Sequence, residues 1–240
     1  NADFGQAVGA AGDVNGDGYA DIVVGAWRYN NITEGLTGGR ACLYHGGPAG
    51  PDAVETWIAY GDQETASFGQ SVSSAGDVNG DGFGDVVVGA ERYTNPERNE
   101  GAVFLYLGSP EGLADTAAWI GDPDVEDTRL GYAVASAGDV DAVGYGDVLA
   151  GGWGYSVNRP QEGVAMLFHG SPSGLAEMPE WIGTGDDDNA RAGWSVASAG
   201  DVNGDGYADI VMGACQGSVT RWLEGEAFLY PGGPGGLARP

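Results

Sequence analysis

The sequence FGQSVSSAGDVNGDGFGDVVVGA, which runs from Phe68 to Ala90, decides the fold. It contains a run of small and β-branched residues (Gln70–Ala75), an acidic loop (Asp77–Asp85) and a valine-rich run that ends at Gly89. Neither run has the length or the period of a helix, so both indicate short strands. The loop is rich in Gly, Asp and Asn, which are the residues that favour a tight hairpin connection.

This stretch recurs along the chain. Its opening residue pairs start 64, 62 and 62 residues apart, at Phe4-Gly5, Phe68-Gly69, Leu130-Gly131 and Ala192-Gly193. A tryptophan recurs with the same 62-residue spacing, at Trp57, Trp119 and Trp181. Such a period is typical of repeat architectures in which each unit packs on its neighbours. We therefore divide residues 1–240, as a single domain or part of one, into repeats 1–63, 64–125, 126–187 and 188–240.

Each repeat contains four short β-rich runs, which in the second repeat are Gln70–Ala75, Asp85–Gly89, Ala102–Leu107 and Ala117–Ile120. A single four-stranded antiparallel sheet cannot bury both of its faces, and radial packing of such sheets as the blades of a β-propeller solves this problem. We predict an all-β fold, a propeller of four blades with four antiparallel strands each. The last repeat ends after Ala227–Tyr230, so its blade is predicted to lack the outer strand.

Composition excludes several other classes of protein. The chain has 46 glycines among its 240 residues, but 42% of the residues are hydrophobic, which is enough for a core and argues against disorder. No apolar run is long enough for membrane insertion. The net charge of −26 excludes nucleic acid and anionic membrane surfaces as partners. Because the chain begins at Asn1 without a signal peptide, we expect a processed precursor or a fragment.

The acidic loops read DVNGDGYAD (Asp13–Asp21), DVNGDGFGD (Asp77–Asp85), DVDAVGYGD (Asp139–Asp147) and DVNGDGYAD (Asp201–Asp209). Side-chain oxygens stand at positions 1, 3, 5 and 9 of the loop, and the backbone carbonyl of residue 7 can add another ligand, as calcium requires. The flanking strands and the missing Glu at position 12 exclude an EF-hand. The predicted calcium ligands are Asp13, Asn15, Asp17, Tyr19, Asp21, Asp77, Asn79, Asp81, Phe83, Asp85, Asp139, Asp141, Tyr145, Asp147, Asp201, Asn203, Asp205, Tyr207 and Asp209.

The third loop departs from this pattern. Val143 replaces the aspartate of position 5 and Ala142 replaces the glycine of position 4, whereas Asp141 stands where the other loops have Asn. The loop keeps three carboxylates but offers one side-chain oxygen fewer. We therefore predict three strong Ca²⁺ sites, in repeats 1, 2 and 4, and one weaker site in repeat 3, with water in the missing position.

The motif halves Phe68-Gly69 and Gly89-Ala90 resemble the FG-GAP repeat family, which occurs in integrin α-subunit propellers and in bacterial extracellular proteins. The proline of the motif is replaced in every repeat, by Trp27, Glu91, Trp153 and Cys215. The resemblance covers almost the whole chain. It implies a calcium-binding propeller, and propellers of this family usually have seven blades. The four blades here therefore form a small ring of their own, join another copy in a larger ring, or belong to a longer chain. It also implies a secreted, extracellular or periplasmic location, where calcium is abundant.

In the resembled integrin family, ligands contact the propeller face opposite the acidic loops. The loops expected on that face are rich in aromatic residues and arginine, which are common interface anchors. The ligand-face candidates are Trp27, Arg28, Tyr29, Arg92, Tyr93, Trp153, Tyr155, Arg159, Arg221 and Trp222. An alternative remains open, in which these aromatic residues cap the blade packing and the arginines pair with nearby carboxylates.

We find no catalytic constellation. His45 and His169 occupy the same place in two repeats, Cys42 aligns with core residues of the other repeats, and no phosphate loop or zinc pattern is present. The sequence therefore favours a non-enzymatic adhesion or protein-interaction module with a protein or carbohydrate ligand. The alternatives are a structural subunit, in which a homo-oligomer or another chain completes the ring, the scaffold part of a longer enzyme, and a lectin-like carbohydrate-binding module.

Overall fold

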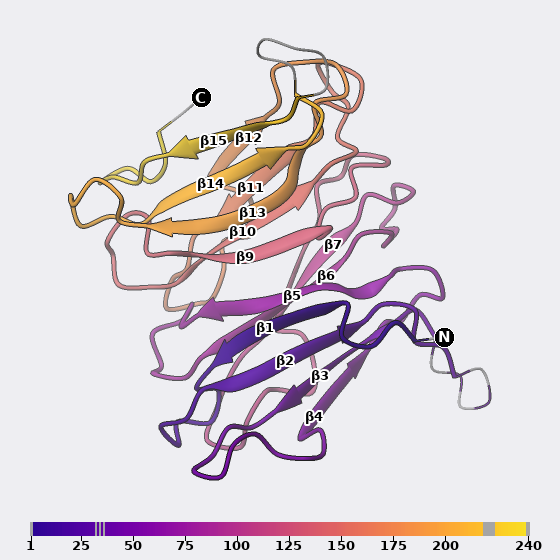
Figure 1. Cartoon of the computed structure of the whole chain (residues 1–240), viewed down its shortest axis with the longest axis vertical. Helices are drawn as coiled ribbons and strands as arrows, with labels where there is room; N and C mark the ends of the chain where they lie inside the picture. The colour runs from indigo at the N-terminus through magenta and orange to yellow at the C-terminus, as the bar shows by residue number, and fades with distance from the viewer. Residues whose placement is uncertain (1, 32, 34, 36, 218–223, 239–240) are drawn as a thin grey trace.

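The computed structural model describes residues 2–31, 33, 35, 37–217 and 224–238. In this part of the chain, fifteen strands form four separate antiparallel sheets, and within each sheet every strand pairs with the next in chain order (Figure 1). Three sheets have four strands and the last has three. The predicted all-β fold and the incomplete last blade are therefore confirmed. No helix among the described residues is long and apolar enough to cross a membrane.

The strands follow the four repeats. The first sheet contains β1 (Ala7–Gly12), β2 (Asp21–Ala26), β3 (Arg40–Tyr44) and β4 (Trp57–Tyr60). The second contains β5 (Phe68–Gly76), β6 (Asp85–Ala90), β7 (Ala102–Tyr106) and β8 (Trp119–Gly121). The third contains β9 (Ala133–Gly138), β10 (Asp147–Gly152), β11 (Val164–Phe168) and β12 (Trp181–Thr184). The fourth contains β13 (Ala192–Gly200), β14 (Asp209–Ala214) and β15 (Glu226–Tyr230).

The second sheet shows how the sequence produces these strands. Every residue of β6 is buried, as expected for a valine-rich strand that packs on both faces. Its partner β5 begins at Phe68, earlier than the predicted Gln70, and β8 begins at Trp119, later than the predicted Ala117. The register between β5 and β6 shifts between Ser74 and Gly76, where a β-bulge leads into the acidic loop.

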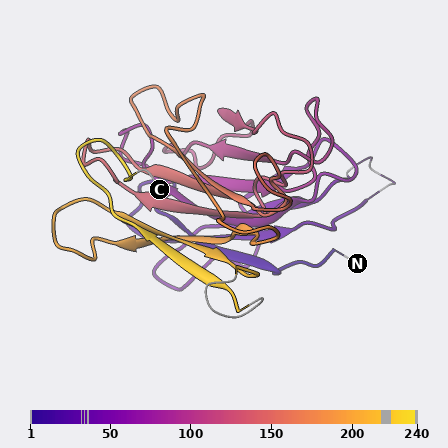
Figure 2. The same ribbon diagram turned by 90° about the horizontal axis from the view of Figure 1, so that it is seen from above.

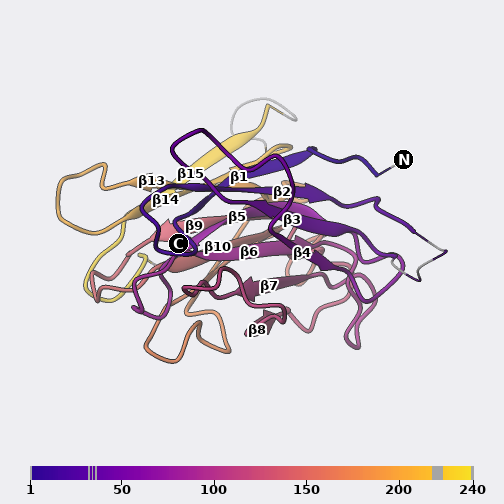
Figure 3. The ribbon, with the colours of Figure 1, turned by 90° about the horizontal axis from the view of Figure 1, so that it is seen from below.

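The sheets pack face to face as the successive blades of a partial β-propeller. The described residues form three hydrophobic clusters, one between each pair of consecutive sheets. The strands β1, β5, β9 and β13 are in contact one with the next, so each blade begins at the inside (Figure 1). From above, the middle repeats lie on one side of the molecule and the first and last strands on the other (Figure 2). Figure 3 shows β5 to β8 following one another across the second blade.

The recurring tryptophans join one blade to the next. Each lies on the outer strand of its sheet and meets an aromatic ring of the following sheet edge to face. The ring-centroid distances are 4.8 Å for Trp57 and Tyr106, 4.9 Å for Trp119 and Phe168, and 4.7 Å for Trp181 and Tyr230. Edge-to-face pairs add to the energy of area burial. The 62-residue spacing of the tryptophans is thus the spacing of the inter-blade contacts.

Candidate functional site

The acidic loops lie at one end of the sheets, because each loop joins the first two strands of its sheet. In the first loop, the carboxylate of Asp13 accepts hydrogen bonds from the backbone N–H groups of Asp17 (3.0 Å) and Gly18 (2.8 Å). The side-chain carbonyl of Asn15 accepts a bond from the Asp17 N–H (3.1 Å), and its amide donates to the Asp17 carboxylate. The second and fourth loops repeat this network. These hydrogen bonds therefore hold the side chains of positions 1, 3 and 5 close to one another within the loop.

The aspartate of position 9 closes each loop. These residues are at most 1% exposed: Asp21, Asp85, Asp147 and Asp209. In the second repeat, one oxygen of Asp85 accepts a bond from the Val78 N–H (2.8 Å) and the other from the Gly108 N–H (2.9 Å). Because Gly108 follows β7, this carboxylate ties the acidic loop to the loop between the third and fourth strands. All four repeats have this arrangement, which was not predicted from the sequence.

No arginine among the described residues neutralises the acidic loops, since none forms an ion pair with a loop aspartate. Burial raises the pKa of Asp85 to about 6, although its two backbone N–H bonds act in the opposite direction. Burial also raises the pKa of Asp147, against the effect of its own backbone bonds and of the nearby His169. A loop of three carboxylates and further oxygens without a protein cation has the donor chemistry that calcium prefers. The residues of the first, second and fourth loops fit a bound Ca²⁺.

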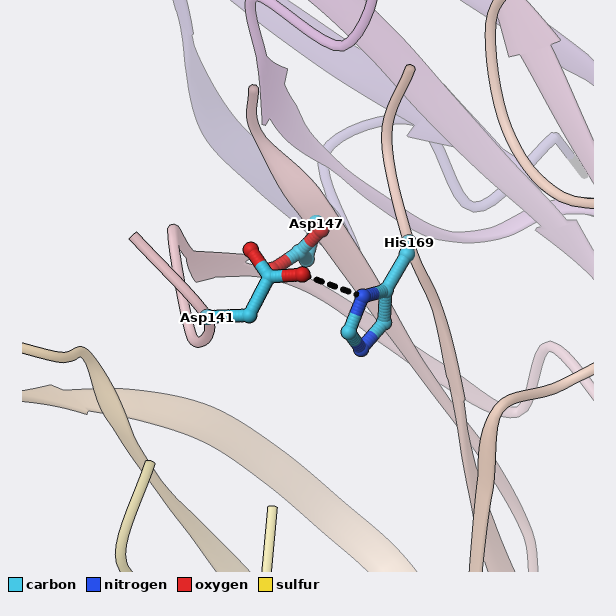
Figure 4. A group of neighbouring side chains, drawn as sticks. All are labelled: Asp141, Asp147 and His169. Carbon is cyan, nitrogen blue, oxygen red and sulfur yellow. Dashed lines mark hydrogen bonds and ion pairs between the residues drawn. The ribbon is translucent and has the colours of Figure 1, made fainter. Parts of the chain in front are cut away.

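The third loop has a different arrangement. The Val143 N–H donates to Asp139 (3.0 Å) and to Asp141 (3.2 Å), so Asp141 takes over the acceptor role that Asn has in the other loops. The second oxygen of Asp141 lies 2.9 Å from Nδ1 of His169, which follows β11 (Figure 4). The ligand atoms of Asp141, Asp147 and His169 lie within 4.8 Å of one another. In the third loop an imidazole therefore lies beside the carboxylates of positions 3 and 9.

On the opposite face of the molecule, several ligand-face candidates line one groove. It has a volume of about 390 Å³, lies between the first and second repeats, and includes Trp27, Arg28, Tyr29 and Arg92. The guanidinium of Arg28 lies 4.2 Å from the Trp27 ring centre and pairs with Asp3 at 3.1 Å. The groove therefore combines aromatic surface with two arginines, each paired with a carboxylate, since Arg92 lies 3.3 Å from Glu91, and Glu64 also lines it.

Trp153 belongs to a second aromatic cluster on this face. Its ring lies 6.3 Å from Tyr132 and 5.9 Å from Trp194, and the guanidinium groups of Arg129 and Arg191 each lie 5.1 Å from its centre. Neither Tyr132 nor Trp194 was among the ligand-face candidates predicted from the sequence. Each of them directly follows the first glycine of its repeat, Gly131 or Gly193. In the first repeat the residue at this place is Gln6, which accepts a hydrogen bond from the Trp27 indole. The place after the first glycine is thus a neighbour of the aromatic residue in the loop between the second and third strands.

Other candidates lie elsewhere. Tyr93 is only 9% exposed and meets Phe104 edge to face, so the prediction that it forms part of a ligand surface is corrected to a core position. Tyr155 is half-buried against the core between the second and third sheets, whereas Arg159 is exposed. Arg221 and Trp222 lie outside the described residues.

The cysteines are not paired with each other. Both are free thiols, with Cys42 buried in the first sheet and Cys215 exposed. Burial raises the pKa of the Cys42 thiol. Cys42 is therefore a core residue, as its alignment with Phe104, Met166 and Phe228 indicated.

These features define a class of protein: a partial β-propeller in which each blade carries an acidic, oxygen-rich loop. Comparison with family models identifies the FG-GAP repeat at residues 4–38, 68–106 and 192–221. The first, second and fourth repeats of this chain therefore each match the FG-GAP repeat. The third repeat, whose acidic loop departs from the pattern, lies outside the matched residues.

Several curated proteins that are similar to the chain are integrin α subunits. The chain is 31% identical to integrin alpha pat-2 of Caenorhabditis elegans over 242 residues, which cover 92% of the chain and 18% of that protein. It is 30% identical to integrin alpha-PS2 of Drosophila melanogaster, over 85% of the chain and 14% of that protein. It is 36% identical to mouse (Mus musculus) integrin alpha-IIb, over 64% of the chain and 15% of that protein. The chain thus spans less than a fifth of the relatives it matches, and it is integrin α-like over most of its length.

Proposed function

We propose that this chain is a calcium-stabilised, non-enzymatic adhesion or protein-interaction module that works outside the cell or in a periplasm. The observation that carries the proposal is the recurrence of one acidic loop at the same place in four blades, each with a buried aspartate and no partner arginine among the described residues. The relatives and the aromatic groove on the other face support a binding role.

Calcium would be held by the side-chain oxygens of positions 1, 3, 5 and 9 and by the carbonyl of position 7. When bound, it supplies the positive charge that the loop carboxylates lack. The chain itself shapes the loop, because backbone N–H groups orient Asp77, and Asp85 holds the loop against Gly108. Calcium that binds only the folded chain stabilises it by RT ln(1 + [Ca²⁺]/Kd) at each site. Such loops suit the millimolar calcium found outside cells.

The first test is thermal unfolding with calcium and with a chelator. At a calcium concentration of about one hundred times Kd, each site adds ~3 kcal/mol, which raises the Tm of a domain of this size by roughly 5–10 °C. We expect a rise of this size for each site that calcium occupies, and a smaller rise with magnesium at the same concentration, because magnesium dehydrates reluctantly. A variant with Asp17→Asn, Asp81→Asn and Asp205→Asn is expected to lose most of it. An unchanged Tm in chelator would contradict the calcium proposal.

The ligand face is proposed to bind a protein, in line with its aromatic and arginine side chains. Arg28→Ala with Arg92→Ala removes two cations from the groove and leaves the acidic loops intact. We expect the double variant to lose binding to a captured partner in surface plasmon resonance while keeping its calcium-dependent Tm. Retention on immobilised glycans that is abolished by the same variant would favour the lectin-like alternative instead.

The alternative of a structural subunit rests on the two end blades. Val8 and Ile22, on the outer face of the first sheet, are 67% and 38% exposed, and Leu229 of β15 is 51% exposed, whereas Val72 is only 7% exposed at the place equivalent to Val8. Sedimentation at increasing concentration tests whether another copy covers these faces. A monomer at all concentrations argues against the shared ring. The scaffold of a longer enzyme is tested by a hydrolase screen, in which the proposed module shows no activity.

A further inference from the structure

A second group of carboxylates lies away from the acidic loops. Glu97 and Glu100 belong to the loop between β6 and β7, and Asp124 belongs to the connection from β8 to β9. One oxygen of each carboxylate lies within 4.8 Å of the others. By the order of the strands, both connections lie at the end of the sheets opposite the acidic loops.

The two glutamates of this group have buried oxygens without a partner. Glu100 is 0% exposed; one oxygen of its carboxylate accepts a bond from the Asn95 N–H, and Oε2 has no hydrogen-bond partner. Oε2 of Glu97 is likewise buried and unpartnered. Buried carboxylate oxygens are rarely left in this way, because losing water without gaining a partner costs free energy.

No described cation compensates these charges. Arg98 lies in the same loop, but its guanidinium is 3.0 Å from Glu126 and 2.6 Å from Asp127. The folded chain therefore gathers negative charge in a place that supplies no positive charge of its own.

The third repeat shows which part of the arrangement is common to the fold. Glu162 occupies the place of Glu100 and is 0% exposed; its Oε1 accepts bonds from the N–H groups of Val157 (3.1 Å) and Asn158 (2.7 Å), and its Oε2 is buried without a partner, as in Glu100. However, Arg159 stands at the place of Glu97 in that repeat. A buried glutamate that closes this loop thus recurs, whereas the convergence of three carboxylates is particular to the second repeat.

We propose that Glu97, Glu100 and Asp124 bind a divalent cation of the calcium class on the face opposite the acidic loops. All three ligands are carboxylates, which are the donors that hard cations prefer, and the exposed side of Asp124 leaves room for water to complete the coordination. The cation would provide the missing partner for both buried oxygens. This site is additional to the loop sites of the proposed function and does not depend on them.

The test is a count of bound calcium by equilibrium dialysis and elemental analysis, with Glu97→Gln and Asp124→Asn combined in one variant. We expect the variant to bind about one calcium ion per chain fewer than the wild type. The matched control, Glu111→Gln with Asp115→Asn, makes the same change in net charge at exposed residues of another loop and should leave the count unchanged. An equal count in wild type and variant overturns the proposal.

A second measurement separates ligand loss from damage to the fold. In chelator, the Glu97 and Asp124 variant should melt at or above the wild-type temperature, because it removes like charges that face each other without a cation. With calcium, it should melt below the wild type. A variant that melts lower in both conditions would show a structural role and overturn the proposal. The Asp17, Asp81 and Asp205 variant loses calcium from the acidic loops alone. When the Glu97 and Asp124 substitutions are added to it, they should still lower the Tm with calcium and not in chelator.

Discussion

Single substitutions make the third acidic loop unlike the other three. Val143 removes a carboxylate and is 56% exposed, so the space that an aspartate would fill is open to solvent. Ala142 adopts a φ of 56°, a left-handed conformation that the other loops give to glycine at this position. Asp141 turns one oxygen to His169. The third loop thus keeps its shape through different contacts, with fewer oxygens free for a metal.

At this scale we predict that Val143→Asp strengthens calcium binding in the third repeat. The substitution restores the oxygen of position 5, and each additional carboxylate ligand raises the affinity of such loops. The calcium-dependent rise in Tm should increase by roughly 2–5 °C over that of the wild type. The isosteric control Val143→Thr adds no carboxylate and should behave as the wild type. An equal rise for Val143→Asp and Val143→Thr would contradict the prediction.

Between elements, the glycines of the FG-GAP motif are where neighbouring blades meet. A Cβ built on Gly25, Gly89 or Gly151 would stand 2.0–2.1 Å from the carbonyl oxygen of Gly69, Gly131 or Gly193, respectively, in the next repeat. The motif glycine of one strand therefore packs directly on the motif glycine of the following blade. This contact gives a physical reason for the two halves of the motif to occur together in each repeat.

We predict that Gly89→Ala destabilises the protein because the new methyl group meets backbone that cannot move aside. Overpacking of this kind costs about 1–3 kcal/mol or more, which lowers Tm by roughly 3–10 °C. Gly213→Ala is a matched control: both positions face a serine Oγ, of Ser71 and Ser195, but only Gly89 faces the carbonyl of another blade. Equal losses of Tm for the two variants would refute the inter-blade interpretation.

Across the whole molecule, negative charge far exceeds positive charge. The net charge is −26, and the acidic loops all lie at one end of the sheets. Like charges gathered on one face repel each other and oppose the compact state. Salt screens this repulsion, since the Debye length falls from about 30 Å at 0.01 M to about 3 Å at 1 M.

We therefore predict that sodium chloride stabilises the metal-free protein more than the calcium-loaded protein. Raising the salt from about 0.02 M to 0.5 M should increase the Tm in chelator, because screening replaces part of the neutralisation that calcium provides. With saturating calcium the same change should have a smaller effect. Differential scanning calorimetry in both conditions measures the difference. A salt effect of the same size with and without calcium would show that the acidic loops are not its source.

Local sequence patterns were sufficient for the blades. The small and β-branched residues of Gln70–Ala75, the valine run before Gly89 and the 62-residue spacing of the tryptophans predicted the strands, the four sheets and the missing outer strand. Strand ends moved by only a few residues, at Phe68 and Trp119. These features depend on residues that are adjacent in the sequence or on the repetition of a pattern, and both can be recognised in one amino-acid sequence.

The sequence by itself determined the repeat, the blade and the acidic loops, because each is encoded within a few adjacent residues. Only the tertiary structure decided which distant groups meet. Asp85 accepts a hydrogen bond from the Gly108 N–H, 23 residues away, and Asp141 contacts His169, 28 residues away. These contacts form because antiparallel pairing brings two loops to the same end of a sheet. Glu100 meets Asp124 for the same reason, because the β6–β7 loop and the β8–β9 connection lie at the same end of the sheets. Such contacts arise from how sheets pair and stack, which no local pattern specifies.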